Sequence, residues 1–159
     1  MKKIILVTLI LCNTLSFGQK VKKPVSTKQK TEVKKRIYLI DKSDFQKIDS
    51  NLVVKKSFQY EAGDGKKVDV QTFISANKVA LDSLGLEKMN FMLDFANISA
   101  KYLVKNKYTY VPRKLALIYS EKRFEWTVKI EFTAQNDMGA IKDSYKFYDF
   151  DKKGKNIIK

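Results

Sequence analysis

The stretch that decides the fold is FEWTVKIEFTAQ, residues 124–135, in which apolar and polar side chains alternate without an error from Phe124 to Gln135. Successive side chains of a β-strand point to opposite faces, so this alternation predicts a strand with one buried face and one wet face. We therefore expect an antiparallel sheet at the centre of the fold.

The segments on either side of this strand predict a meander. Leu115 to Tyr119 forms a strand before it, and Asn136 to Gly139 turns the chain after it. Ile141, Tyr145 and Phe147 then continue the buried side. Tyr148 and Phe150 are out of phase with them, which predicts a bulge near Phe147. We expect a last turn at residues 152–154 and a final short strand at Ile157 and Ile158.

A second β-rich region lies nearer the N-terminus. Residues 52–61 and 67–75 alternate around the turn Gly63-Asp64-Gly65, which predicts a β-hairpin. Ile37 to Ile40 reads as a first short strand. Ser43 followed by Gln46 is a capping-box pattern and predicts a helical turn over residues 44–49.

One long helix is predicted over residues 84–104, since one face of that segment is continuously apolar at helical spacing. A second apolar stripe, Phe91, Phe95, Ile98 and Tyr102, lies outside that face. It is covered either by the sheet or hairpin, or by a partner, a ligand or a second copy of the chain. The expected fold class is α+β, an antiparallel sheet (N-terminal hairpin plus C-terminal meander) packed around one long amphipathic helix.

Residues Met1–Gln19 have the features of a secretion signal. Lys2 and Lys3 precede an apolar run, and Ser16 and Gly18 place small residues before a cut after Gly18. We expect cleavage there and export to the periplasm or the medium, without a membrane-spanning segment. Residues 19–36 would then form a flexible basic tail, and residues 37–159 a single α+β domain.

The tail contains eight basic residues and one acidic residue. It would act as a solvated tether, or as a weak contact for anionic lipid, lipopolysaccharide or a cell-wall polymer. Export and the lack of interleaved aromatic residues argue against nucleic acid. The candidate contact residues are Lys20, Lys22, Lys23, Lys28, Lys30, Lys34, Lys35 and Arg36.

Histidine is absent from the chain, and Cys12, inside the signal, is its single cysteine. A Ser-His-Asp triad and His-containing zinc sites are therefore excluded, and we predict no catalytic, cofactor or metal residues. One acid stands out. Asp143 shares its alternation with Ile141 and Tyr145, which places it on the buried face, where it would be partnered, near an exposed edge, or functional.

The second half resembles a layout found in small exported bacterial domains of unknown function, in which an amphipathic helix precedes a proline-marked loop and an antiparallel meander. The matching segments are Val104-Lys105-Asn106, Pro112, Thr133-Ala134-Gln135-Asn136 with Gly139, and Phe150-Asp151-Lys152-Lys153-Gly154-Lys155. Such domains are similar to cystatin-like and nuclear-transport-factor-2-like folds, whose curved sheet wraps a helix. The resemblance implies a fold that hosts binding proteins and a few enzymes.

We therefore expect an exported, non-catalytic binding domain that recognises a protein or an envelope polyanion. The first alternative is an enzyme that uses carboxylates, Tyr or Lys in a pocket between helix and sheet. The second is a homodimeric structural protein of the envelope.

Overall fold

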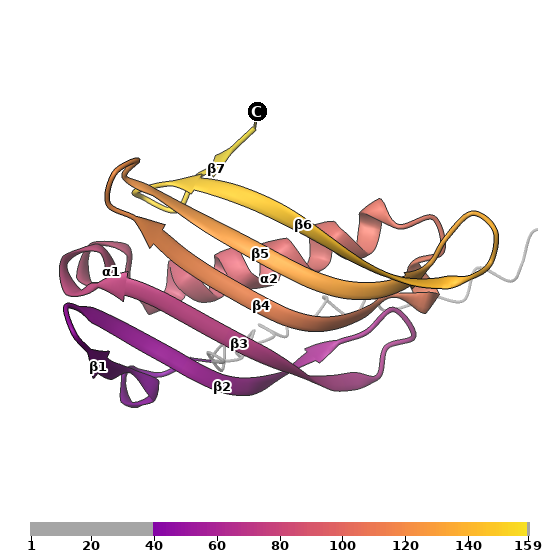
Figure 1. The fold of residues 1–159 in the computed structure, drawn as a ribbon, viewed down its shortest axis with the longest axis horizontal. Coiled ribbons are helices and arrows are strands. Elements are labelled where there is room, and N and C mark those ends of the chain that lie inside the picture. The colour runs from indigo at the N-terminus through magenta and orange to yellow at the C-terminus, as the bar shows by residue number, and fades with distance from the viewer. Residues whose placement is uncertain (1–39, 159) are drawn as a thin grey trace, which may run out of the picture. The chain divides into compact units, whose positions relative to one another are not determined.

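The computed structural model describes residues 40–158, so the predicted signal, the basic tail and most of the first predicted strand lie outside the described residues. The described chain is α+β: a seven-stranded sheet carries its helices on one face, and Figure 1 looks onto the opposite face. The elements are η1 (Lys42–Asp44), β1 (Gln46–Ile48), β2 (Asn51–Glu61), β3 (Lys67–Asn77), α1 (Lys78–Leu84), α2 (Leu86–Leu103), η2 (Lys107–Thr109), β4 (Val111–Ser120), β5 (Glu125–Gln135), β6 (Ile141–Asp151) and β7 (Asn156–Ile157).

The strands lie in the sheet in their order along the chain, from β1 to β7. All neighbours are antiparallel except β3 and β4, which run parallel. A parallel pair needs a connection that returns the chain to the end where the first strand began, and α1 and α2 provide it. The predicted hairpin and meander are present as β2–β3 and β4–β5–β6, joined into one larger sheet by the parallel pair.

One face of the sheet and the inner side of α2 form the core. Trp126, Val128 and Ile130 of β5 are fully buried, as the alternation of residues 124–135 predicted. Met92, Leu93 and further small or apolar residues of α2 pack against them. Phe124 is the exception in this stretch, because it lies in the β4–β5 turn with a positive φ of 54° and is exposed.

The long helix predicted over residues 84–104 is present as α2, and a second, shorter helix, α1, which was not predicted, precedes it. The side chain of Asn77 at the end of β3 accepts a hydrogen bond from the backbone N–H of Ala80 and so caps α1. Gly85, at φ 78° and ψ 155°, ends α1 and begins α2. This conformation is accessible almost only to glycine, so Gly85 sets the break.

The start of the described chain differs from the sequence prediction. Ile40 is buried but not in a strand. The capping box forms at Asp41 and Asp44, and it caps η1. The helical turn predicted over residues 44–49 is wrong, because Gln46–Ile48 pairs with β2 as an edge strand.

The structure also corrects the prediction of which β6 side chains are buried. Val128 lies opposite Tyr148 and Trp126 opposite Phe150, so Tyr148 and Phe150 point to the helix side. Ile141, Tyr145 and Phe147 are therefore on the other face and exposed. The register between β5 and β6 runs without a bulge at Phe147, and the irregularity is in β4, between Pro112 and Lys114.

Candidate functional site on the open face of the sheet

The sheet face opposite α2, here called the open face, is not covered by any described helix (Figure 1). Its side chains are mixed, with lysines, short polar residues and aromatic rings. Phe73, Tyr145 and Phe147 are all exposed large apolar residues on this face. Exposed aromatic rings beside cationic side chains are typical of a binding surface, and the open face is therefore the candidate site.

The strand register places the open-face residues in rows that run across the sheet. One row joins five residues of β2 to β6 in turn, namely Lys55, Phe73, Ala116, Lys129 and Phe147. The next row is Ser57, Gln71, Lys114, Glu131 and Tyr145. Neighbouring strands lie about 4.8 Å apart, so Lys55 and Lys129 are separated by roughly 14 Å.

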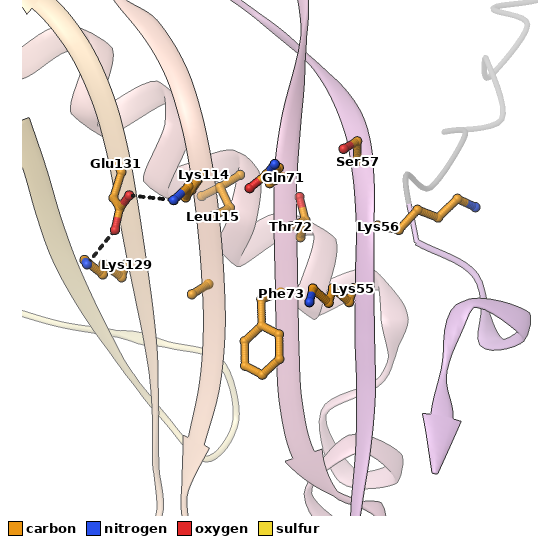
Figure 2. Close-up of a pocket in the computed structure, with 11 residues that line it drawn as sticks. Lys55, Lys56, Ser57, Gln71, Thr72, Phe73, Lys114, Leu115, Lys129 and Glu131 are labelled. Carbon is orange, nitrogen blue, oxygen red and sulfur yellow. Dashed lines mark hydrogen bonds and ion pairs between the residues drawn. The ribbon is translucent and has the colours of Figure 1, made fainter. Parts of the chain in front are cut away.

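A groove of about 500 Å³ lies along these two rows. Ala116 has the shortest side chain of the first row and forms the floor between Phe73 and Lys129. Figure 2 shows Lys56 pointing away from the groove, as expected for the residue after Lys55 on a strand. The open-face groove is defined by the side chains of Lys55, Ser57, Gln71, Phe73, Lys114, Ala116, Lys129 and Glu131.

Two of the three lysines of the groove lie close to its one carboxylate, that of Glu131. The ammonium group of Lys129 donates a 2.6 Å hydrogen bond to Oε1 of Glu131, and Nζ of Lys114 lies 3.9 Å from Oε2 (Figure 2). The hydrogen bond from Lys129, together with the charges of both lysines, holds the pKa of Glu131 below its ordinary value. Three lysines against one carboxylate leave the groove with a net positive charge.

The site extends toward β6 beyond the groove. A second hollow of about 610 Å³ begins at Lys114 and Glu131 and reaches Tyr145 and Asp143. Nζ of Lys129 lies 5.5 Å from the ring centroid of Tyr145, and the rings of Tyr145 and Phe147 meet edge to face at 5.6 Å. The cation and these rings therefore form one continuous surface.

Asp143 is exposed and lines the second hollow on the open face. The prediction that it points into the buried side of the sheet is therefore wrong. It does share a face with Ile141 and Tyr145, as the alternation indicated, but that face is the open one. The space between α2 and the sheet is filled by core side chains, and Asp143 does not face it.

The four residues of the predicted second apolar stripe of the helix differ in how far they are buried. Phe95 is half-buried, and its ring meets Tyr148 and Phe150 edge to face at 5.7 Å and 5.6 Å. Phe91, Ile98 and Tyr102 are exposed. The sheet therefore covers one member of the stripe, through β6, and leaves the other three accessible.

The eight basic residues predicted as a polyanion contact lie outside the described residues. Sequence reasoning missed the groove because Lys55, Lys114 and Lys129 are far apart in the chain. The alternation of residues 124–135 does place Lys129 and Glu131 together on the polar face of one strand. Which residues of other strands lie beside them depends on strand order and register, which the sequence pattern does not give.

Two further observations concern residues 40–158. This part of the chain contains no group of three or more acidic, histidine or cysteine side chains placed to hold a metal ion. None of its helices combines the length and apolar character needed to cross a membrane.

Comparisons with protein-family models, with curated proteins and with solved structures each found no match for this chain.

Proposed function

We propose that this chain is an exported, non-catalytic binding domain, and that its open-face groove binds an extended polyanionic polymer of the cell envelope. The observation that carries the proposal is the convergence of Lys55, Lys114 and Lys129, from three different strands, on one groove. Export rests on the signal-like residues 1–19.

The shape of the site supports an extended ligand. The first row places cations at Lys55 and Lys129, with the rings of Phe73 and Phe147 beside them. A chain lying across the strands would meet two charged positions, Lys55 and Lys129, with apolar positions between and beyond them, over four strand spacings, roughly 19 Å. This pattern fits an acidic polysaccharide, whose anionic groups pair with ammonium groups and whose sugar rings pack on aromatic rings.

The location of the groove argues against an extended peptide as the ligand. Peptides that bind sheets in extended form usually add to an edge strand through backbone hydrogen bonds. Here β3, β4 and β5, which line most of the groove, are interior strands whose backbone groups are already paired on both sides. A ligand in the groove would therefore contact side chains and not unpaired backbone groups.

The experiment is a binding assay on the chain expected after cleavage, residues 19–159, with polygalacturonate, dextran sulfate and neutral dextran as probes. Both acidic polymers should bind, less tightly at high salt, and neutral dextran should not. Lys55→Gln should weaken binding about fivefold, as expected for the loss of one contact of ~1 kcal/mol.

The matched control is Lys146→Gln. Lys146 is also an exposed strand lysine, but the register places it on the other face of the sheet, opposite Ile130. Equal losses for both variants would mean that only net charge matters, and would refute the groove. A third variant, with all eight basic residues of segment 19–36 changed to Gln, separates the tail from the groove. Complete loss of binding in that variant would place the contact on the tail.

A further inference from the structure

The irregularity in β4 adds one cationic side chain to the second hollow. Pro112 pairs with Phe132 and Lys114 pairs with Glu131, so Arg113 has no residue opposite it in β5. A bulged residue leaves the regular alternation of its strand, and bulges commonly aim a side chain at a site. Here Arg113 lies beside Lys114 in the lining of the second hollow.

The side chain of Arg113 is available to a ligand. It is exposed, and within residues 40–158 its guanidinium group forms no hydrogen bond or ion pair. The neighbouring ammonium groups of Lys114 and Lys129, in contrast, both lie near the carboxylate of Glu131. A guanidinium group presents a planar fork of N–H donors that matches the two oxygens of a carboxylate. Arg113 can therefore hold a carboxylate of a ligand in a defined orientation.

The opposite wall of the second hollow belongs to β6 and carries an acceptor and an aromatic ring. Asp143 pairs with Thr133 and Tyr145 pairs with Glu131, so both lie two strand spacings from β4, roughly 10 Å. Asp143 forms no hydrogen bond or ion pair with any other residue of the described range 40–158. An ionised carboxylate accepts hydrogen bonds and donates none, so Asp143 favours hydroxyl groups and repels anions.

These groups together select one kind of sugar. The second hollow has a volume of about 610 Å³, within the range of small-ligand pockets, about 300–1,000 Å³. A sugar with one carboxylate and free hydroxyl groups would pair with Arg113, donate to Asp143 and pack its ring on Tyr145. A sulfated sugar fits less well, because each sulfate replaces a hydroxyl group and brings a negative charge toward Asp143.

We propose that the second hollow is a subsite for one uronic acid unit of the polymer, and that it favours carboxylated over sulfated sugars at this position. The inference rests on the proposed function, because a polymer in the open-face groove brings its sugar units to this place. The two sites are continuous, since Lys114 and Glu131 line both. The groove provides affinity for polyanions in general, and the second hollow discriminates among them.

The first test is Asp143→Ala in the chain of residues 19–159, with polygalacturonate and dextran sulfate as probes. By net charge alone, the loss of a carboxylate should tighten binding of every polyanion. The subsite predicts opposite changes. Affinity for polygalacturonate should fall about three- to tenfold, because its hydroxyl groups lose an acceptor, whereas dextran sulfate should bind more tightly. Tighter binding of both polymers, or no change in either, would overturn the proposal.

The second test is Arg113→Lys, which keeps the charge and removes the fork. Affinity for polygalacturonate should fall at least about threefold, and affinity for dextran sulfate should hardly change. The matched control is Arg123→Lys. Arg123 is also exposed, but it lies in the β4–β5 turn near Glu125 and lines neither the groove nor the second hollow, so its variant should bind like the wild type. Equal losses in the two variants, or for the two polymers, would refute the subsite.

Lys55→Gln distinguishes failure of the subsite from failure of the groove. Lys55 lines the groove and not the second hollow, so this change should weaken binding of both polymers. If it does so while Asp143→Ala and Arg113→Lys bind like the wild type, the subsite is refuted and the proposed function stands. If the wild-type chain binds neither polymer, both proposals are refuted.

Discussion

Lys129 and Glu131 lie two residues apart on β5, and the ammonium group of one donates a 2.6 Å hydrogen bond to the carboxylate of the other on the open face. Residues two apart on a strand share a face, so the pair is local in sequence. The pair also occupies the groove proposed to bind a polyanion, where Glu131 competes with the ligand for Lys129 and Lys114.

Glu131→Gln is expected to tighten binding of dextran sulfate. The change removes the single carboxylate among the groove side chains and frees two ammonium groups, so affinity should rise roughly two- to fivefold, in line with exposed charge interactions of ~0.5–1 kcal/mol. The wild-type chain should also bind dextran sulfate more tightly as the pH falls through the lowered pKa of Glu131, because the carboxylate is neutralised while the sulfate groups remain charged. Measuring the affinity of both chains against pH checks the two expectations, since Glu131→Gln should remove this pH dependence. A loss of affinity in Glu131→Gln would contradict the role assigned to the groove.

Ala116→Ile is expected to block the groove while the fold remains stable. Ala116 forms the groove floor on the open face, where a β-branched side chain suits the strand but fills the space between Phe73 and Lys129. Affinity for the polymer should fall at least about tenfold, corresponding to ~1.4 kcal/mol. Ser120→Ile, at the end of the same strand, is the control and should bind like the wild type. Unchanged affinity in Ala116→Ile would show that the ligand does not enter the groove.

Tyr110→Phe is expected to destabilise the fold by about 1–3 kcal/mol, because it leaves a buried acceptor without its donor. The hydroxyl of Tyr110 donates a 2.9 Å hydrogen bond to Oδ1 of Asn97 in α2, and both side chains are buried. Urea unfolding measures the change. Tyr108→Phe, two residues away at an exposed position, should be nearly neutral. Equal effects in the two variants would mean that the buried hydrogen bond contributes little.

Stability is expected to fall as the pH rises above about 10, the ordinary pKa of tyrosine. Burial raises the pKa of Tyr60 and Tyr110 above that value. The unfolded chain therefore loses these protons before the folded chain does, so the stabilisation is complete below the unfolded pKa and is lost as the pH increases past it. Urea midpoints from about pH 8 to about pH 12 check this. Tyr110→Phe should show a shallower decline, and a flat profile in the wild type would contradict the account.

The sequence predicted the parts of the fold that depend on local patterning. Residues 124–135 formed β5 except at Phe124, and the turn at Gly63-Asp64-Gly65 joined β2 to β3 as expected. The facing of β6 was predicted wrongly because aromatic residues occur at both parities of that strand. Tyr145 and Phe147 compete with Tyr148 and Phe150 for the buried side, and the pairing of Val128 with Tyr148 decides between them.

The candidate site could not be read from the sequence, because it depends on which strands are neighbours. Lys55 and Lys129 come into one row only because β3 and β4 pair in parallel between their strands. The pattern of a hairpin and a meander did not determine that pairing. The resemblance to cystatin-like and nuclear-transport-factor-2-like folds stays a prediction, as does the secretion signal.

Mapping the bound ligand residue by residue tests whether the open-face groove holds it. Backbone amide chemical shifts of the chain of residues 19–159 would be recorded during titration with an acidic oligosaccharide. If the groove holds the ligand, the shifts will cluster around Lys55, Phe73, Ala116 and Lys129. Shifts confined to residues 19–36, or to the exposed α2 side chains Phe91, Ile98 and Tyr102, would show that the ligand binds elsewhere.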